Sequence, residues 1–464
     1  MKFIIKSIIT VLLVLFATNT SAQVLRSSYF LEEISLRHQM NPAFQSENNY
    51  ISIPLIGNTV VDIQGNVGLS NFIYEIDNSN YELTTFLHPS VSRNTFLNKL
   101  HDNNRLNIGL NLTLLSVGFH AWNGFNTVEL GVKSNTSLNI PYALFDFMKT
   151  GMSDGKQEYN IKDLGLRSNN YAELAFGHAR TVNDKLQVGA KFKILLGGAG
   201  VNAQIDDMYV KMSKDEWEIK MHGEMDASLK GGTFKTRKSS DNTRNLINGF
   251  DINSPRIGGF GTGIDLGAIY KLREDITLSA AVLDFGFISW NNALRGYNDG
   301  IPFKFDGFES LVIESEFSSS KTILREQLDD VIDDAKDMLM FYDKGETGGR
   351  TTMLATTVNL GAEYVFPYYD KMTFGLLSST RINGIYTWSE ARLSANVSPL
   401  RWFNTALSYG LSNYGSSLGW ALNFHPANFN AYFGFDYLAT TLTPQFLPVN
   451  KPNFVTNIGF NVTF

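Results

Sequence analysis

The chain has 464 residues, no cysteine, 39 Lys plus Arg against 45 Asp plus Glu, and 13% aromatic against 18% charged residues. The lack of cysteine excludes disulfides, thiolate metal sites, a cysteine nucleophile and the acylated cysteine of a bacterial lipoprotein. So low a charged fraction, with so many aromatic residues, argues against disorder and against a solvated cytosolic enzyme. The formal net charge of −6 provides no basic footprint, so no nucleic-acid partner is expected.

Residues 1–22 have the pattern of an export signal peptide. Lys2 and Lys6 supply a positive start, an apolar run follows over 8–17, and Ala22 is the expected cleavage site. The alternative is a membrane anchor helix, but this run is too short to cross a hydrocarbon core roughly 30 Å thick. Later stretches are not apolar enough for a membrane helix. The exported chain is therefore either soluble beyond the inner membrane or a β-barrel in the outer membrane.

Residues 23–57 precede the first clear strand and lack the pattern of alternating strands joined by short turns. In a barrel they could fold into the lumen as a plug, with Arg37, Asn41 and Pro42 as the candidate plug residues. A short periplasmic tail followed by an extra strand is the alternative. The sequence leaves both open.

From residue 58 onward, apolar and polar residues alternate with period two. In 106–114 every even position is apolar, and the same pattern returns in 186–196, 264–272 and 431–437. Such alternation is typical of β-strands with one apolar face. It fits a soluble sandwich with an apolar core, or a membrane barrel with lipid outside and a polar lumen inside.

Three further features favour the barrel. Tight polar turns recur, and short connections alternate with long ones as in outer-membrane barrels. Four tryptophans are expected near strand ends, where amphipathic rings prefer the headgroup level: Trp122, Trp290, Trp388 and Trp402. The chain also stops on an alternating strand with Phe460, Val462 and Phe464, which resembles the C-terminal signal that outer-membrane barrels present to their assembly machinery. That machinery and outer-membrane lipid are therefore expected partners.

The predicted fold is all-β, an antiparallel transmembrane barrel of about 14 strands over residues 58–464. An even count places both termini and every short turn in the periplasm. The predicted strands are 58–72, 105–121, 126–140, 170–181, 186–199, 259–272, 277–290, 352–366, 372–381, 388–397, 402–411, 417–424, 431–440 and 453–464. The external loops are then 73–104, 142–169, 200–258, 291–351 and 441–452.

One loop carries a predicted helix. Residues 321–342 place apolar side chains at helical spacing, with aspartates largely on the other faces. This stripe is expected to pack on the barrel rim. The aspartates lack the spacing of an EF-hand and are more typical of a solvated acidic face than of a Ca²⁺ site.

The predicted inner face is mixed in charge. Charged side chains alternate there with Asn, Gly, Ser and Thr, and the lumen-lining candidates are Lys191, Lys193, Asp265, Lys271, Arg392 and Asp436. Such a lumen can hold water or pair its charges with a plug. Because neither sign dominates, strong ion selectivity is not predicted.

Catalytic and cofactor motifs are weak. Residues 151–155 match G-x-S-x-G but lie in a polar loop rather than in the strand and helix setting of a nucleophile elbow. His120 and His178 lie in predicted strands, where a barrel-rim lipid hydrolase would place a histidine, but a polar lumen is the more ordinary position. Gly-rich residues 258–263 lack the βαβ context of a dinucleotide site. No catalytic residue, cofactor or metal site is therefore expected.

Several short sequence segments resemble those of a known family. Residues 28–31, 37–44, 102–107 and 116–119 resemble the N-terminal part of an uncharacterised family of outer-membrane barrels from Bacteroidota, catalogued as a domain of unknown function. The resemblance covers the full mature length. More distantly, Asn41-Pro42-Ala43 and the strand estimate are similar to FadL-like transport barrels. In those barrels the N-terminal segment plugs the lumen, and hydrophobic substrates leave sideways into the membrane.

Two main functions follow as hypotheses. The first is an outer-membrane barrel that passes a small hydrophobic compound through a plugged lumen. The alternative is a non-transporting barrel whose long loops, 200–258 and 291–351, anchor a secretion, assembly or surface protein partner, because loops of that size are uncommon without a function. A barrel-rim lipid enzyme comes third.

Overall fold

The computed structural model describes residues 25–54, 56–75, 83–151, 158–213, 216–300, 302–305, 337, 339–437 and 453–464. Four predicted features lie wholly or mostly outside these residues: the signal peptide 1–22, the G-x-S-x-G motif, the helix 321–342 and the loop 441–452. At the C-terminal end of that predicted helix, Tyr342 is instead the first residue of a strand.

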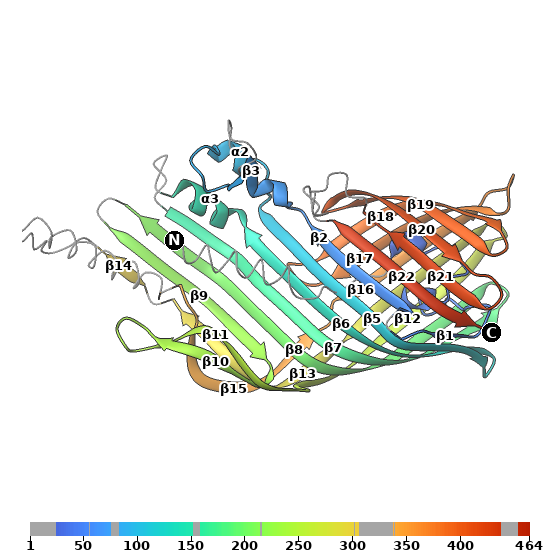
Figure 1. Ribbon diagram of the computed structural model, residues 1–464, viewed down its shortest axis with the longest axis horizontal. Helices are drawn as coiled ribbons and strands as arrows, with labels where there is room; N and C mark the ends of the chain where they lie inside the picture. Colours follow the sequence, from blue (N-terminus) through green and yellow to red (C-terminus); the bar gives the residue numbers. More distant parts are fainter. Residues whose placement is uncertain are drawn as a thin grey trace, which may run out of the picture.

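Within the described residues, 14 antiparallel strands close into a barrel, as the alternation predicts (Figure 1). Each strand pairs with its neighbours, and the last pairs with the first to close the ring. In order they are β2 (Asn58–Gly65), β5 (Asn103–Ala121), β6 (Gly124–Pro141), β7 (Glu158–Asn183), β8 (Leu186–Met212), β12 (Gly259–Arg273), β13 (Ile276–Asp299), β16 (Thr356–Val365), β17 (Met372–Ile382), β18 (Trp388–Leu400), β19 (Phe403–Ser412), β20 (Gly415–Phe424), β21 (Phe429–Phe435) and β22 (Phe454–Thr463). A short strand, β1 (Tyr50–Ser52), precedes β2 along the same edge.

The two faces of each strand have opposite character. On β8, the outward Val188 and Phe192 are 38% and 48% exposed, whereas the inward Lys191 and Lys193 are each 3% exposed. Large apolar side chains continue this outer surface on β12, β16 to β20 and β22. A closed barrel with an apolar outside and a polar inside is the architecture of outer-membrane proteins, because no backbone polar group then faces lipid unpaired.

Short turns gather at one end of the barrel, which is called here the short-turn end. The β5 to β6 turn is the two residues Trp122 and Asn123, both with positive φ (56° and 57°), as a tight type I′ hairpin requires. The C-terminus lies at the same end (Figure 1). The opposite end is called the long-loop end.

At the long-loop end, on the left in Figure 1, one side of the barrel wall extends far beyond the other. Strands β7 and β8 have 26 and 27 residues, whereas β19, β20 and β21 have 10, 10 and 7. The segments 200–258 and 291–351 were expected to be loops, but their described parts are mostly strand. The strands of this extension are β9 (Trp217–Ser228), β10 (Lys230–Lys238), β11 (Asn245–Arg256), β14 (Phe303–Phe305) and β15 (Tyr342–Met353).

The extension grows from the barrel by ordinary strand pairing. β9 pairs with the far end of β8 and with β13, and β15 continues beside β13 where β16 begins. β10 and β11 form a hairpin beside them. Because the projecting ends of β8 and β13 offer unpaired backbone groups, the loop segments complete the sheet instead of remaining irregular.

A small aromatic layer covers another part of the long-loop end. It is built from β3 (Ile73–Glu75), β4 (Leu83–Thr85), α2 (Arg93–Leu97) and α3 (Tyr142–Thr150). Phe96 is fully buried in it, stacked on Phe86 with ring centroids 4.2 Å apart, and Phe145 packs edge-on against both.

Two of the four tryptophans are not where the sequence suggested. Trp122 and Trp402 are 77% and 46% exposed, as interface residues would be, but Trp290 and Trp388 are 0% and 1% exposed. Trp290 fits against the glycines 197, 200 and 259, and its Nε1 donates to Thr352 Oγ1 at 2.8 Å. Proximity to a strand end therefore does not decide which face a ring takes. No helix among the described residues is long and apolar enough to cross a membrane.

Candidate functional site

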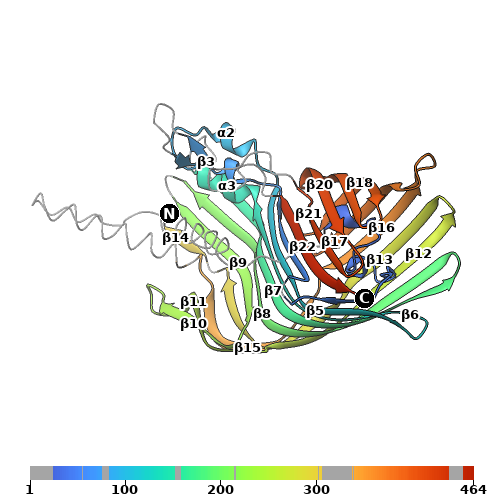
Figure 2. The same cartoon turned by 45° about the vertical axis from the view of Figure 1, so that its right-hand side comes forward.

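Residues 25–49, called here the lumen segment, lie inside the barrel (Figure 2). The segment includes two short 3-10 turns, η1 (Arg26–Ser28) and η2 (Arg37–Gln39). From Leu25 to Phe44 every side chain is buried except Glu32, Glu33 and Gln39. Its backbone bonds to opposite walls, since Asn359 Nδ2 of β16 donates to Met40 O and Asn430 Nδ2 of β21 donates to Glu33 O, each at 3.0 Å.

Glycines on the inner wall make room for the lumen segment. A Cβ at Gly267 of β12 would overlap Asn41 Oδ1, and one at Gly189 of β8 would overlap the carbonyl oxygen of Pro42. Phe30 is accommodated in the same way at Gly375 of β17. The wall is therefore shaped to the segment by the absence of side chains.

The three plug candidates lie at this contact. Asn41 Nδ2 donates to the carbonyl oxygens of Ala268 and Ala280, both at 3.3 Å, and so ties the segment to β12 and β13. Pro42 and Asn41 are buried, with Asn41 0% exposed. Arg37 is also buried, donates from Nε to Tyr29 O at 3.1 Å, and lies over the Phe44 ring at 4.0 Å, so it holds the segment's own fold.

A buried network of four charges anchors the start of the lumen segment. Arg26 Nε is 3.0 Å from Glu390 Oε1, and its backbone N–H donates to Asp436 Oδ2 at 2.6 Å. Arg392 joins the same two carboxylates, at 2.7 Å from Glu390 Oε1 and 3.4 Å from Asp436 Oδ1. The Arg26 guanidinium also lies 4.2 Å from the Trp388 ring centroid. Two cations and two carboxylates balance, so this network, called here the anchor network, is held without net charge.

A second contact joins the middle of the segment to β5, β6 and β8. Gln39 Nε2 donates to Glu129 Oε1 at 2.7 Å, and Lys191 Nζ pairs with the other oxygen of Glu129. His38 Nε2 shares a hydrogen bond with the Tyr50 hydroxyl, which is 2.8 Å from Ser116 Oγ. The segment is thus fixed at its start, middle and end by different walls.

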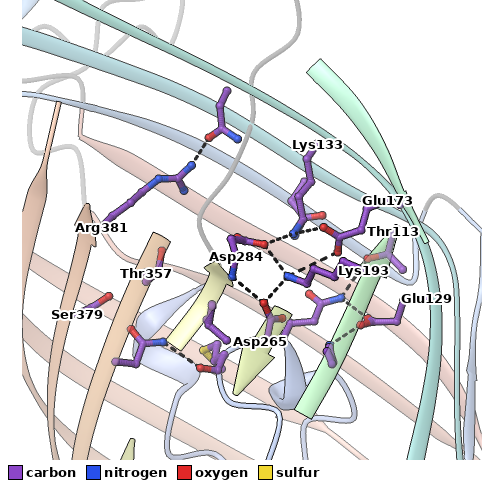
Figure 3. A pocket seen from close by; sticks show the side chains of 18 of the residues that line it. Thr113, Glu129, Lys133, Glu173, Lys193, Asp265, Asp284, Thr357, Ser379 and Arg381 are labelled. Atoms are coloured by element: carbon purple, nitrogen blue, oxygen red, sulfur yellow. Dashed lines mark hydrogen bonds and ion pairs between the residues drawn. The ribbon is translucent and has the colours of Figure 1, made fainter. Parts of the chain in front are cut away.

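Beside the segment lies a charged cluster (Figure 3) whose members come from the neighbouring strands β6, β7, β8, β12 and β13. Lys193 Nζ is 2.7 Å from Asp265 Oδ1 and 2.6 Å from Asp284 Oδ1, and Lys133 Nζ is 3.0 Å from Glu173 Oε2 and 3.2 Å from Asp284 Oδ1. Asp284 reaches both lysines because β13 bulges there, with φ of 56°. The backbone N–H of Asp284 donates to Asp265 at 2.7 Å. These five residues are called here the lumen cluster.

The lumen cluster and the lumen segment, together with other wall residues, line a partly open cavity of about 90 Å³. Its lining is mixed, with charged groups of both signs and apolar Met40, Leu110 and Leu377. Arg381 of β17 reaches across the lumen from the opposite wall and donates to Asn135 Oδ1 of β6 (Figure 3). The cavity has room for a few water molecules but is far smaller than the roughly 300 to 1,000 Å³ of an ordinary ligand pocket.

The six lumen-lining candidates fall into three places. Lys191, Lys193 and Asp265 line the cavity, and Arg392 and Asp436 lie in the anchor network. Lys271 lies near the short-turn end, where its ammonium pairs with Glu274 at 2.9 Å instead of facing the cavity. The alternation alone does not show how far along the barrel a residue lies.

Sequence reasoning missed other residues of the site. Glu129, Lys133 and Glu173 occupy inward positions of predicted strands, and following one parity across those strands would have found them. Asp284 could not be found so, because the bulge at this residue changes the alternation. Glu390 could have been found in the same way, because it lies two residues before Arg392 in a predicted strand, whereas Arg26 gave no sequence signal.

The remaining candidates lie outside the lumen centre. His120 is exposed beside Asn49, and His178 Nδ1 is 2.9 Å from Asn126 Oδ1, both near the short-turn end. Phe460 of β22 stacks on Phe429 at 5.4 Å, Val462 of the same strand is 39% exposed, and Phe464, directly after the strand, is 68% exposed. Among the described residues, no group of three or more His, Asp and Glu side chains is placed to hold a metal ion.

Comparisons with known proteins give one family. The model described as "Family of unknown function (DUF5723)" matches residues 42–436, more than four fifths of the chain. No curated protein matches the sequence. The match names no organism, so the expected origin in Bacteroidota stays a prediction.

Several solved structures resemble this chain at low similarity. The toluene transporter TodX of Pseudomonas putida has a TM-score of 0.39 and 8% identity, over 96% of this chain and 95% of that chain. A FadL homologue of Pseudomonas aeruginosa has 0.33 and 11%, over 96% and 98%. The translocator domain of the autotransporter NalP from Neisseria meningitidis has 0.33 and 9%, over 96% and 100%. Such scores are too low to transfer an activity to this chain.

Proposed function

Because the chain belongs to the DUF5723 family of unknown function, we propose a function from its own geometry: gated passage of a small hydrophobic compound across the outer membrane. The observation that carries the proposal is the lumen segment, a stretch of chain separate from the wall that fills the barrel and leaves a cavity of about 90 Å³. The segment acts as the gate and the barrel as the path. Export by residues 1–22 brings the chain to that membrane.

The size of the cavity supports a gate that moves. A closed apolar cavity of about 150 Å³ can bind benzene, and the cavity of about 90 Å³ beside the lumen segment is smaller than that. Passage therefore requires displacement of the lumen segment. Its attachments are hydrogen bonds, ion pairs and packing, all of which can be broken and remade.

The wall behind the segment supports a hydrophobic solute. Leu25, Leu31, Ile34 and Leu36 pack there against wall residues that include Ala406, Ala421 and Tyr432. Further along, Tyr171, Leu195, Ile288, Trp290 and Leu354 form a second apolar patch adjoining the lumen cluster. When the segment leaves, the first of these wall strips is uncovered, and an apolar solute on it would recover the lost burial.

Removal of the lumen segment tests the proposal. We expect proteoliposomes with the protein lacking residues 25–48 to take up toluene faster than those with the full chain, with a smaller gain for glucose. The Arg26→Gln variant, which loosens the anchor network, should fall between the two. Heat-modifiable mobility on gels checks that each barrel is folded. Unchanged uptake of both solutes by a folded deletion variant would refute the gate.

One observation favours the second candidate, an accessory barrel for a protein partner. Among the described residues, the raised wall of β7 to β11 and β15 has no counterpart on the other side, and passage by itself does not require it. Purification from the native membrane in mild detergent, followed by mass spectrometry, would decide. A stoichiometric protein that is lost when residues 230–256 are deleted, with toluene uptake unchanged, would favour this candidate.

A further inference from the structure

Three arginines gather on the inner face where the extension leaves the barrel. Arg350 of β15 is paired across the sheet with Trp290, and Arg295 of β13 is paired with Asp226 of β9. Arg167 of β7 lies on the same face, where its Nε donates to Asn202 Oδ1 at 3.3 Å, and Asn202 pairs in turn with Asp226. These residues lie toward the long-loop end, away from the lumen segment.

The Arg350 side chain is nine-tenths buried but poorly satisfied. Its exposed fraction is 9%, and its Nε and Nη2 are buried without a hydrogen-bond partner. Nη1 of the guanidinium lies 3.4 Å from the carbonyl oxygen and 3.7 Å from the Oδ2 of Asp226. Buried donors of a charged group that remain unpaired are costly, so a built acceptor is expected there.

The unpaired edge has a specific geometry. Nε and Nη2 lie on the same side of a guanidinium and donate in parallel, which is the edge that binds a carboxylate or phosphate through two hydrogen bonds. The Arg295 side chain is 40% exposed and its Nη2 donates to Gly349 O at 3.4 Å, but its Nε is buried without a hydrogen-bond partner, 3.8 Å from Asp226 Oδ1. The carboxylate of Asp226 is too far from Arg350 Nη1 and from Arg295 Nε to accept a hydrogen bond from them. The Asp226 side chain is 24% exposed.

The charges around the three arginines also favour an anion. Arg167 is held by the neutral amide oxygens of Asn202 and Asn383, the latter at 3.0 Å from Nη1. Among the described residues, Asp226 is thus the one carboxylate that forms ion pairs with this group of three guanidiniums. The cluster keeps a net positive charge inside a chain whose formal charge is −6.

We propose that Arg350 and Arg295 form a binding site for an oxyanion, the carboxylate or phosphate group of a small soluble solute. The anion accepts two hydrogen bonds from the Nε and Nη2 edge of Arg350 and one from Nε of Arg295. Asp226, which lies 3.7 Å from Arg350 Nη1 and 3.8 Å from Arg295 Nε, competes with the anion. The site does not depend on the lumen segment or on passage of a hydrophobic compound.

The test measures binding of two plain anions to the full-length protein in neutral detergent. Isothermal titration with inorganic phosphate and with acetate, at constant ionic strength, should give saturable binding of at least one of them. Arg350→Gln should weaken it roughly tenfold to a hundredfold, the range for hydrogen bonds to charged groups. Arg401→Gln, an exposed arginine at the β18 to β19 turn, should leave it unchanged.

The Asp226→Asn variant distinguishes competition with the anion from a purely structural role of Asp226, by the direction in which the anion affinity changes. If Asp226 competes with the anion, its neutralisation should tighten binding, whereas a purely structural ion pair predicts no gain. Arg295→Gln provides a milder variant should Arg350→Gln fail to fold. Absence of saturable binding by the wild-type protein, or equal affinity of wild type and folded Arg350→Gln, would overturn the proposal.

Discussion

At the scale of single residues, the inner wall is specified as much by missing side chains as by charged ones. Gly267 and Gly189 leave the space that Asn41 and Pro42 occupy, and the charged side chains around them are paired in groups. Buried charges are costly unless paired, so the pairing explains how a polar lumen can be filled by chain rather than water.

Adding one methyl group should therefore disturb the lumen segment at a chosen point. Gly267→Ala puts a Cβ onto Asn41 Oδ1, and we expect a loss of about 1 to 3 kcal/mol, typical of overpacking, together with faster toluene uptake. Gly263→Ala on the same strand is the matched control, because its Cβ has no neighbour closer than 3.6 Å. Thermal unfolding in detergent and uptake by proteoliposomes measure both effects. Equal behaviour of the two variants would contradict this account of the contact.

At the scale of elements, the β10 to β11 hairpin is tied down by one carboxylate. Asp337 accepts from the Arg237 guanidinium of β10, and from Ser240 N and Oγ, both at 2.8 Å. Burial raises the pKa of Asp337, but the hydrogen bonds from Arg237 and Ser240 outweigh it and hold the pKa below the usual aspartate value. The hairpin therefore depends on an ionised side chain outside the barrel wall.

This dependence predicts an acid-sensitive hairpin. Because the folded pKa of Asp337 is depressed, its stabilisation is complete above the ordinary aspartate pKa of about 3.9 and is lost as the pH falls through the lower folded value. We expect pepsin to cut 230–256 faster as the pH is lowered below 4, while the barrel stays intact. Asp337→Asn should remove this pH dependence and be cut readily at every pH at which pepsin acts. Equal pH profiles for the two proteins would contradict the role given to Asp337.

At the scale of the whole molecule, the barrel reverses the arrangement of a soluble protein, with apolar side chains on the outside and charged side chains on the inside. The outer surface is apolar, with Leu376 and Leu407 49% and 55% exposed, while charges are held within. Ion pairs across five adjacent strands and the cross-lumen bond from Arg381 to Asn135 join walls that are distant in sequence. Closure of the ring and filling of the lumen are therefore coupled.

The lipid-facing surface makes a direct prediction. Leu376→Arg places a charge on the outer face of β17, and we expect a cost of about 2 to 4 kcal/mol near the membrane midplane. Folding into lipid vesicles, followed by heat-modifiable mobility, measures it. Thr236→Arg, on the exposed β10 strand away from the barrel, should insert as the wild type does. If both variants insert equally well, the outer face of β17 does not meet lipid.

The sequence by itself determined the strands of the barrel and their inner and outer faces, because period-two alternation is a local property of the chain. Each of the predicted strands has a counterpart among the observed ones, from β2 to β22. Lys191, Lys193 and Asp265 could be placed on the inside for the same reason. The signal peptide and the assembly role of Phe464 stay predictions.

Only the tertiary structure decided what meets inside the barrel. Arg26 finds Glu390 and Asp436, more than 360 residues away, because ring closure brings the last strands beside the lumen segment. The bulge at Asp284, the buried Trp290 and the pairing of 200–258 into an extended wall likewise depend on neighbouring strands. Alternation predicts whether a side chain faces the inside or the outside of the barrel, but contacts across the lumen form only once the sheet has closed.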